Sequence, residues 1–379
     1  MNAKTNPAFE QIEDQPGLPR VLLIGDSISI GYTLAVRAEL EGKANVHRPA
    51  TNCASTRRAI EEIDEWVGDG NWDVIHFNWG LHDIVHLDEK GERAAPESGS
   101  HQVPLPEYRK FLDELVQKLK KTGAKLIWCT TTPVPDGSVY RSSGDEIGHN
   151  KAALPIVQRH GVQINNLYTF ALGILPFIQQ PANVHFTPEG SAILAKAVAQ
   201  NILQALNTES VNLEDPDRLA LLQAQWRFAD GLVPGEPNAG LVEQLAESPA
   251  RLAEYDDSGW EICENIKKGV SKGLSFGWYR IAVTLPGEIN GEDVTGKKVW
   301  FETCIDDYGE LWVDGACDLA FGESGHGAAS GFNAPQRVLV SGSAEPGQRH
   351  VIACLAINSP LGRPGGGYFM RYARLQFEK

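Results

Sequence analysis

Two residues that lie far apart in the chain, Ser27 and His185, have the side chains of a nucleophile and of the base that activates it. A serine hydroxyl is a weak nucleophile until a neighbouring base takes its proton, and histidine titrates in the useful pH range. Ser27 follows the apolar run of residues 21–24 and precedes a segment with helical spacing, residues 30–40. It therefore lies at a predicted strand-to-helix turn, where open α/β folds have their sites and helix N–H groups can stabilise an oxyanion.

Each of the two residues also has an ordinary structural interpretation. Ser27 could merely cap the helix that follows it. His185 lies just before Thr187, Pro188 and Glu189, which are typical of a helix N-terminus, and a histidine there could be a packing or capping residue. The catalytic interpretation therefore depends on the two residues together rather than on either one alone.

A third polar segment, residues 78–83, follows the predicted strand 72–77. Because the carboxyl ends of parallel strands meet at one edge of a sheet, this segment would place hydrogen-bond donors beside Ser27. The alternative is a glycine-containing turn in which His82 and Asp83 are local caps. The segment reads Asn78-Trp79-Gly80-Leu81-His82-Asp83.

The first half of the chain alternates apolar runs with helical segments. The runs at residues 21–24, 72–77 and 124–130 predict strands, and residues 107–121 have the apolar spacing of a helix. Strands separated by helices pair in parallel, with helices on both faces of the sheet. We therefore expect an α/β domain over residues 19–206, after a loose polar leader at residues 1–18.

The second half of the chain has a different pattern. Residues 207–258 are expected to form a partly helical connector, with helices over residues 217–228 and 239–253. From residue 259 onward, short β-rich runs are separated by Gly, Pro, Asn and Asp, so residues 259–379 predict an all-β sandwich. Within it we expect Trp278, Trp300 and Trp312 to pack in the core, and the glycine-rich segment 362–368 to be a loop.

Composition excludes several classes of protein. The chain has 34 Lys and Arg against 49 Asp and Glu, a net charge of −15, which argues against a nucleic-acid or anionic-membrane surface. No run approaches the ~20 apolar residues of a membrane span, and the first 20 residues have no apolar core of a signal peptide. The six cysteines lack any CxxC spacing, so neither structural zinc nor a redox pair is expected from them.

These segments together resemble the conserved blocks of the SGNH/GDSL hydrolases. Ile24-Gly25-Asp26-Ser27 is similar to the first block, Gly80-Leu81-His82-Asp83 to the third, and Ala182-Asn183-Val184-His185 to the fifth; residues 52–56 fall where the second block belongs. The resemblance covers residues 19–206. It implies a flavodoxin-like α/β hydrolase of esters that needs no cofactor or metal.

The resemblance also implies roles for individual residues. Ser27 would be the nucleophile and His185 its base. The oxyanion would be held by the N–H groups of Ser27 and Ala54, together with His82. The remaining expected site residues are Asn78 and Asn52, as alternative oxyanion donors, and Asp26, Gly80 and Asp83, as supporting residues.

Three positions depart from the family pattern. His82 replaces the usual oxyanion-hole asparagine, and Ala54 replaces a glycine, so a positive φ there would be disfavoured. Ala182 stands where the family has the triad aspartate, three residues before His185. The site could therefore be a Ser-His dyad, an inactive site, or a triad with its acid supplied from elsewhere. A backbone carbonyl or the Asn183 amide could orient the imidazole instead.

The β-rich half resembles the galactose-binding-like jelly roll that accompanies many glycoside hydrolases, through residues 276–280 and 305–315. The pairing of the two halves favours an esterase that removes acyl groups, acetyl above all, from a carbohydrate. One alternative is a small-acyl or lipid esterase or thioesterase with a structural β domain. Another is a catalytically impaired glycan-binding protein on an esterase fold, which the absence of an acid at residue 182 would favour.

Overall fold

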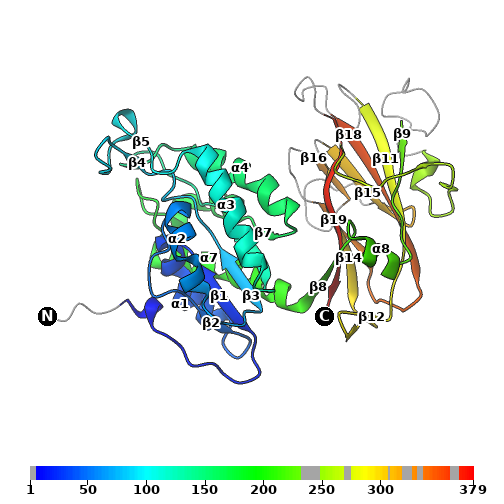
Figure 1. Cartoon of the computed structure of the whole chain (residues 1–379), viewed down its shortest axis with the longest axis horizontal. Helices are drawn as coiled ribbons and strands as arrows, with labels where there is room; N and C mark the ends of the chain where they lie inside the picture. The colour runs from blue at the N-terminus through cyan, green and yellow to red at the C-terminus, as the bar shows by residue number, and fades with distance from the viewer. Residues whose placement is uncertain are drawn as a thin grey trace. The chain divides into compact units, whose positions relative to one another are not determined.

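The computed structural model divides the chain into two compact units, Met1–Leu206 and Asn207–Lys379 (Figure 1). It describes residues 6–231, 248–268, 275–305, 308–317, 327–330, 336–358 and 367–379. Each unit has its own hydrophobic core. No helix in these residues combines the length and the apolar character that a membrane crossing requires.

The first unit is built on a five-stranded parallel sheet with the strand order β2-β1-β3-β6-β7. Renumbered along the sheet, this is the flavodoxin-like order, in which a switch point lies between the first strand and the third. The predicted α/β fold is therefore confirmed. The strands are β1 (Arg20–Ile24), β2 (Asn45–His47), β3 (Val74–Phe77), β6 (Lys125–Cys129) and β7 (Gln163–Asn165).

Helices cover both faces of this sheet. Leu23 of β1 points to the side covered by α1 and α7, whereas Leu22 and Ile24 point to the side covered by α2, α3 and α4. This alternation follows from the pleat of a strand that is buried on both faces. The helices are α1 (Ser27–Glu39), α2 (Thr56–Val67), α3 (Leu105–Lys120), α4 (Asp145–Arg159), α5 (Leu167–Leu172), α6 (Leu175–Ile178) and α7 (Pro188–Asn207).

A small hairpin of β4 (His86–Leu87) and β5 (Ser100–His101) is inserted between β3 and α3 (Figure 1). It begins three residues after Asp83, so it continues directly from the polar segment 78–83. The sequence pattern did not predict the β4–β5 hairpin.

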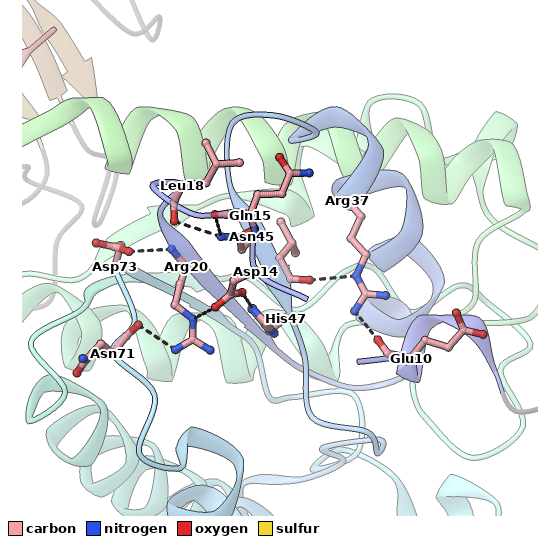
Figure 2. A network of polar contacts seen from close by, with 11 residues as sticks. Glu10, Asp14, Gln15, Leu18, Arg20, Arg37, Asn45, His47, Asn71 and Asp73 are labelled. Atoms are coloured by element: carbon pink, nitrogen blue, oxygen red, sulfur yellow. Dashed lines mark hydrogen bonds and ion pairs between the residues drawn. The ribbon is translucent and has the colours of Figure 1, made fainter. Parts of the chain in front are cut away.

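The polar segment before β1 is fastened to the sheet edge rather than loose. The Asn45 carboxamide of β2 accepts a hydrogen bond from the Gln15 N–H at 2.8 Å and donates to the Gln15 and Leu18 carbonyls. Asp14 also contacts His47 at 2.6 Å, as Figure 2 shows. Because Asn45 satisfies three backbone groups of this segment, the described part of the expected leader, residues 6–18, is ordered by specific contacts.

The second unit is an antiparallel β sandwich, as predicted. A six-stranded sheet and a four-stranded sheet share one core, to which Tyr279 and Ile352 of the first sheet and Phe301 and Leu375 of the second contribute. The first sheet runs β10 (Glu261–Ile262), β9 (Arg227–Asp230), β11 (Ser275–Thr284), β18 (Arg349–Asn358), β15 (Tyr308–Val313) and β16 (Ala328–Ser330). The second runs β17 (Gln336–Ser341), β14 (Lys298–Ile305), β19 (Met370–Glu378) and β8 (Thr208–Asn212), and β12 (Glu288–Ile289) pairs with β13 (Glu292–Asp293).

The expected helical connector at residues 207–258 is wrong in its described part. β8 and β9 belong to the two sheets of the sandwich, and only α8 (Pro216–Leu221) is helical within residues 217–228. The reason is tertiary: Val211 and Phe228 are buried in the sandwich core, and strand pairing with β19 and β11 overrides local helical spacing. Residues 232–247 and 359–366, with most of the second expected helix and of the glycine-rich segment, lie outside the described residues.

The expected core tryptophans divide into two groups. Trp278 and Trp312 are buried, as predicted. Trp300 is half-buried, with its indole N–H donated to Glu378 at 2.7 Å and the Arg337 guanidinium stacked 4.0 Å from the ring centroid. The polar edge of an indole needs such a partner, which explains why Trp300 lies at the rim of the sandwich core.

Candidate functional site

Ser27 begins helix α1, and the residue that caps this helix is Asp26. The Asp26 carboxylate accepts a hydrogen bond from the Ile28 N–H at 2.9 Å. Ser27 itself makes no capping bond to the helix; its hydroxyl is instead in contact with His185. Gly25 allows the tight turn before it, since a Cβ there would lie 2.9 Å from Ser29. The capping interpretation of Ser27 is therefore wrong, because its neighbour performs that task.

Arg48, which the sequence analysis did not single out, lies beneath this turn. It is 3% exposed and donates hydrogen bonds to the Gly25 carbonyl at 3.4 Å and the Thr51 carbonyl at 3.2 Å. It also bonds the hydroxyls of Ser29 and Thr33 on α1. Burial lowers the pKa of Arg48, but a guanidinium stays protonated at any physiological pH. Arg48 thus ties the nucleophile turn to the loop after β2.

His185 is held by a narrow loop that ends at helix α7. Gln179 and Phe186 form an antiparallel bridge, and the Gln180 N–H donates to the His185 carbonyl at 2.9 Å. The Thr187 hydroxyl then accepts from the Gly190 N–H at 2.9 Å and caps α7, as its sequence predicted. These contacts fix His185 in place, and its Nε2 lies 2.8 Å from Ser27 Oγ.

The contacts of Asn183 define which nitrogen of His185 carries the proton. Asn183 Oδ1 lies 2.7 Å from His185 Nδ1 and 3.1 Å from the His185 backbone nitrogen. A backbone N–H can only donate, so the Asn183 atom facing it is the oxygen, and Nδ1 must also donate to that oxygen. His185 Nε2 is then the unprotonated nitrogen, which accepts the Ser27 hydroxyl.

The amide of Gln180 supports this orientation of Asn183. Gln180 Nε2 donates to the Phe186 carbonyl at 3.1 Å, so Gln180 Oε1 is the atom that accepts from Asn183 Nδ2, also at 3.1 Å. Ala182, at the position of the family aspartate, is exposed and has a φ of 52°. The amide that contacts the imidazole therefore comes from the residue two before His185, not three.

Two of the expected oxyanion donors have other partners. The Ala54 N–H donates to Asn52 Oδ1 at 2.9 Å, and Ala54 has a φ of 46°, a conformation that glycine adopts more readily than alanine. Asn78 Nδ2 donates to the Cys129 carbonyl at 2.7 Å and to Thr131 Oγ1 at 3.3 Å. Among the described residues no acceptor faces the Ser27 N–H or the Asn52 Nδ2 group. These two donors remain for a ligand.

His82 and Asp83 have different surroundings, although they are neighbours. Burial lowers the pKa of His82; the Asp26 carboxylate acts in the opposite direction, and Arg141 reinforces the lowering. His82 is thus favoured as the neutral imidazole, which has one N–H to donate. Asp83 is fully buried and accepts from the N–H of Thr56 at 3.0 Å and from its hydroxyl, at the start of α2. Burial raises the pKa of Asp83 to about 7.

Gly80 and Arg141 keep the segment 78–83 in place. A Cβ at Gly80 would lie 1.9 Å from Thr131 Oγ1, so only glycine fits against the segment that follows β6. Arg141 donates to the Leu81 carbonyl at 2.6 Å, and burial lowers the pKa of Arg141 to about 10. Arg141 comes from the segment before α4, so no local sequence pattern indicated its contact with residue 81.

The sheet order, the strand-to-helix turn at Ser27 and the position of His185 before the last helix give the first unit the fold of an SGNH/GDSL hydrolase domain. No family model matches the chain, and no curated protein matches it. Among solved structures, it is similar to an acetyl xylan esterase at 17% identity, over 48% of this chain and 99% of that one, with a TM-score of 0.40.

Two further solved structures have comparable similarity. A lipase/acylhydrolase from Enterococcus faecalis is 17% identical over 49% of this chain and 95% of its own, with a TM-score of 0.40. An acetylxylan esterase from Geobacillus stearothermophilus is 16% identical over 48% of this chain and 94% of its own, also with a TM-score of 0.40. At such identities, the activity of this chain has to be argued from its own side chains.

Proposed function

We propose that the first unit is a serine esterase in which Ser27 is the nucleophile and His185 its general base. The observation that carries this proposal is the 2.8 Å contact between Ser27 Oγ and His185 Nε2. Both members of the pair are fixed by local capping contacts, and the tautomer of His185 leaves Nε2 free to accept a proton. A nucleophile and a base within hydrogen-bond reach, with the base held by a third group, form the general arrangement of acyl-transfer enzymes.

The reaction would proceed in two halves. Ser27 Oγ attacks the ester carbonyl while His185 Nε2 takes its proton, and the tetrahedral intermediate collapses as His185 returns that proton to the departing alcohol. Water then attacks the acyl-serine with His185 again as base, and the acid is released. The donors that have no partner among the described residues, the Ser27 N–H and Asn52 Nδ2, would hold the oxyanion together with His82.

Asn183 would take the positioning task of the missing aspartate. In a triad, replacing the acid by an amide can cost about 10⁴ in turnover when the amide selects the wrong tautomer. Here the His185 backbone N–H fixes the amide so that its oxygen faces Nδ1, and the correct tautomer is kept. An amide lacks the negative charge that stabilises the imidazolium. We therefore expect the site to be active, with a lower turnover than a site that has a carboxylate.

For the substrate we propose an acylated carbohydrate, with acetyl as the acyl group that is transferred to Ser27 and then to water. The support is the β sandwich of the second unit, together with its resemblance to galactose-binding-like modules. The test is acetate release from acetylated oligosaccharides against hydrolysis of esters with longer acyl chains. A strong preference for long chains would favour the alternative, a lipid or small-acyl esterase or thioesterase.

A fluorophosphonate probe tests the enzyme proposal directly, because it reacts only with an activated serine. We expect the full chain to be labelled, S27A to be unlabelled, and H185Q to be labelled much more slowly. S29A is a matched control, since Ser29 lies in the same helix turn and bonds Arg48 rather than His185. Absence of labelling in folded protein that binds glycans would favour the alternative of an impaired glycan-binding protein.

A further inference from the structure

A cluster of metal-ligating side chains lies outside the Ser27 site, where the β4–β5 hairpin meets the start of α4. His86 and His101 are directly opposite each other in the two strands, and Asp145 is the first residue of α4. One ligand atom from each of the three residues lies within 4.8 Å of the other two. We propose that these side chains bind a divalent transition-metal ion, with Zn²⁺ the ion expected.

The donor set fits this class of ion. Imidazole nitrogens with one carboxylate oxygen are the ligands of many zinc sites, in which the fourth position is filled by water. His86 is buried, whereas His101 and Asp145 are partly exposed, so an ion would have a path of entry and room for a water ligand. Small rotations of the two partly exposed side chains would bring the donors to the roughly 3.3 Å separations that zinc bond lengths of about 2.0–2.1 Å require.

The surroundings of His86 already hold its ring as a ligand needs. The Tyr140 carbonyl accepts the His86 backbone N–H at 2.9 Å, and His86 Nδ1 lies 3.3 Å from the same oxygen. A carbonyl can only accept, so Nδ1 carries the proton and Nε2 keeps its lone pair. Such an outer hydrogen bond from a ligand histidine to a carbonyl is a regular feature of metal sites.

His101 and Asp145 are also pre-positioned. His101 Nε2 lies 2.9 Å from Asp145 Oδ2, and the His101 and His86 ring centroids are 4.7 Å apart. Behind them, His149 is buried with its Nδ1 3.2 Å from the Asp145 carbonyl, which supports the first turn of α4. Gly99 allows the strands to approach, because a Cβ there would lie 3.1 Å from the His86 Cβ.

A bound ion would also stabilise the β4–β5 hairpin. The β4 and β5 strands have only two residues each, and a hairpin of this size is marginally stable on its own. A metal ion would join three segments distant in sequence and would hold the hairpin that follows His82. No sequence motif indicates this site, since the ligands are separated by 15 and 44 residues and only the fold brings them together.

Calorimetric titration of the metal-free, untagged full chain with Zn²⁺ tests the proposal, with Co²⁺ absorption as a second readout. We expect one Zn²⁺ per chain and a tetrahedral Co²⁺ spectrum without thiolate charge-transfer bands. H101Q and D145N should each weaken Zn²⁺ binding by more than the about 10- to 100-fold that loss of an outer hydrogen bond costs. H160Q is the matched control, because His160 forms the same kind of pair with Asp113, at 2.7 Å, without a second histidine.

Thermal unfolding separates a metal site from a simple His–Asp ion pair. With a metal site, Zn²⁺ raises the unfolding temperature of the wild type and of H160Q but not that of H101Q, since binding to the folded state stabilises it. Zn²⁺ affinity that is unchanged in H101Q and D145N, or Co²⁺ spectra dominated by thiolate bands, would overturn the proposal. So would an H101Q variant whose stability falls equally with and without Zn²⁺.

Discussion

Asn183 Oδ1 lies 2.7 Å from His185 Nδ1, and the same oxygen accepts the His185 backbone N–H at 3.1 Å. The two contacts close a small ring between residues separated by only one position, so the backbone itself orients the amide. The chain thus has an imidazole with a defined tautomer but without a carboxylate. The catalytic competence of His185 therefore depends on the side chain of Asn183.

Replacing Asn183 by alanine should lower kcat by about 10²-fold or more with little change in KM. The reason is that His185 Nδ1 would lose its acceptor. A mispositioned base raises the activation barrier but does not change the affinity for the substrate. Steady-state kinetics on a small acetyl ester measure this. An N183A enzyme with wild-type kcat would show that Asn183 has no positioning role.

The variant N183D is the informative companion of N183A. A carboxylate at the same position accepts from Nδ1 and also stabilises the imidazolium, so kcat should be at least as high as in the wild type. The acidic limb of the pH–rate profile should move to higher pH, because the carboxylate favours the protonated imidazole. A merely structural role for Asn183 would leave that limb where it is.

Restoring the family aspartate at Ala182 should have little effect. Ala182 is exposed, its backbone has a φ of 52°, and His185 Nδ1 is already bonded to Asn183. We expect A182D to change kcat by less than about threefold, which corresponds to roughly 0.7 kcal/mol in the activation barrier. An increase of tenfold or more would mean that the loop can reposition and that Asn183 is a poor substitute.

The parts of the site that depend on local patterns could be predicted from the sequence. A strand followed by a capped helix placed Ser27 at the sheet edge, and the Thr187-Pro188 start of α7 placed His185 before a helix. The sequence could not show whether Asn183 or a backbone carbonyl orients the His185 imidazole, because that depends on the shape of the turn from Gln180 to His185. No pattern encodes which way an amide points.

Contacts between segments far apart in the sequence could not be predicted either, because no local pattern encodes them. Arg48 reaches the Gly25 carbonyl from the loop after β2, and Arg141 reaches Leu81 from the segment before α4. In the second unit, β8 has only two buried side chains, Thr208 and Val211, too few for a periodic signal. It becomes a strand because β19 offers it an edge to pair with.

The buried carboxyl of Asp83 should make the stability of the first unit depend on pH. Burial raises its pKa to about 7, whereas an unfolded aspartate titrates near about 4. Below pH ~4 both states are protonated and there is no effect. Between pH ~4 and ~7 the unfolded state ionises first, so the free energy of unfolding falls as pH rises and is constant above that range.

Asp83→Asn removes the ionisable carboxyl, and with it this loss of stability at higher pH, while keeping an oxygen for the Thr56 N–H. The stability of D83N relative to the wild type should therefore rise by a few kcal/mol between pH 4 and pH 8, since each pKa unit is worth about 1.4 kcal/mol. Urea unfolding at both pH values measures it. D113N should show no such rise, because burial raises the pKa of Asp113 but His160 and Arg159 bring it below its ordinary value, so its effect on stability changes only below pH ~4. Parallel curves for D83N and wild type would contradict the prediction.

Gly80 should tolerate no side chain. The Cβ of G80A would lie 1.9 Å from Thr131 Oγ1 and 3.0 Å from two further atoms of that side chain, so the segment that carries His82 must shift. Overpacking of this kind costs about 1–3 kcal/mol. G148A is the matched control: Gly148 lies in α4 with no atom within 4 Å of its Cβ position, and alanine there should be neutral or stabilise by up to about 1 kcal/mol.

A double-mutant cycle between Gly80 and Thr131 shows whether the clash with Thr131 causes the destabilisation expected for G80A. T131A removes the hydroxyl that the new Cβ would meet, although Thr131 Oγ1 also faces Asn78 Nδ2 at 3.3 Å, so T131A alone should be mildly destabilising. The G80A/T131A double variant should then be more stable than the sum of the two single effects, by about 0.5 kcal/mol or more. Strict additivity would instead mean that G80A destabilises the unit for a reason other than contact with the Thr131 side chain.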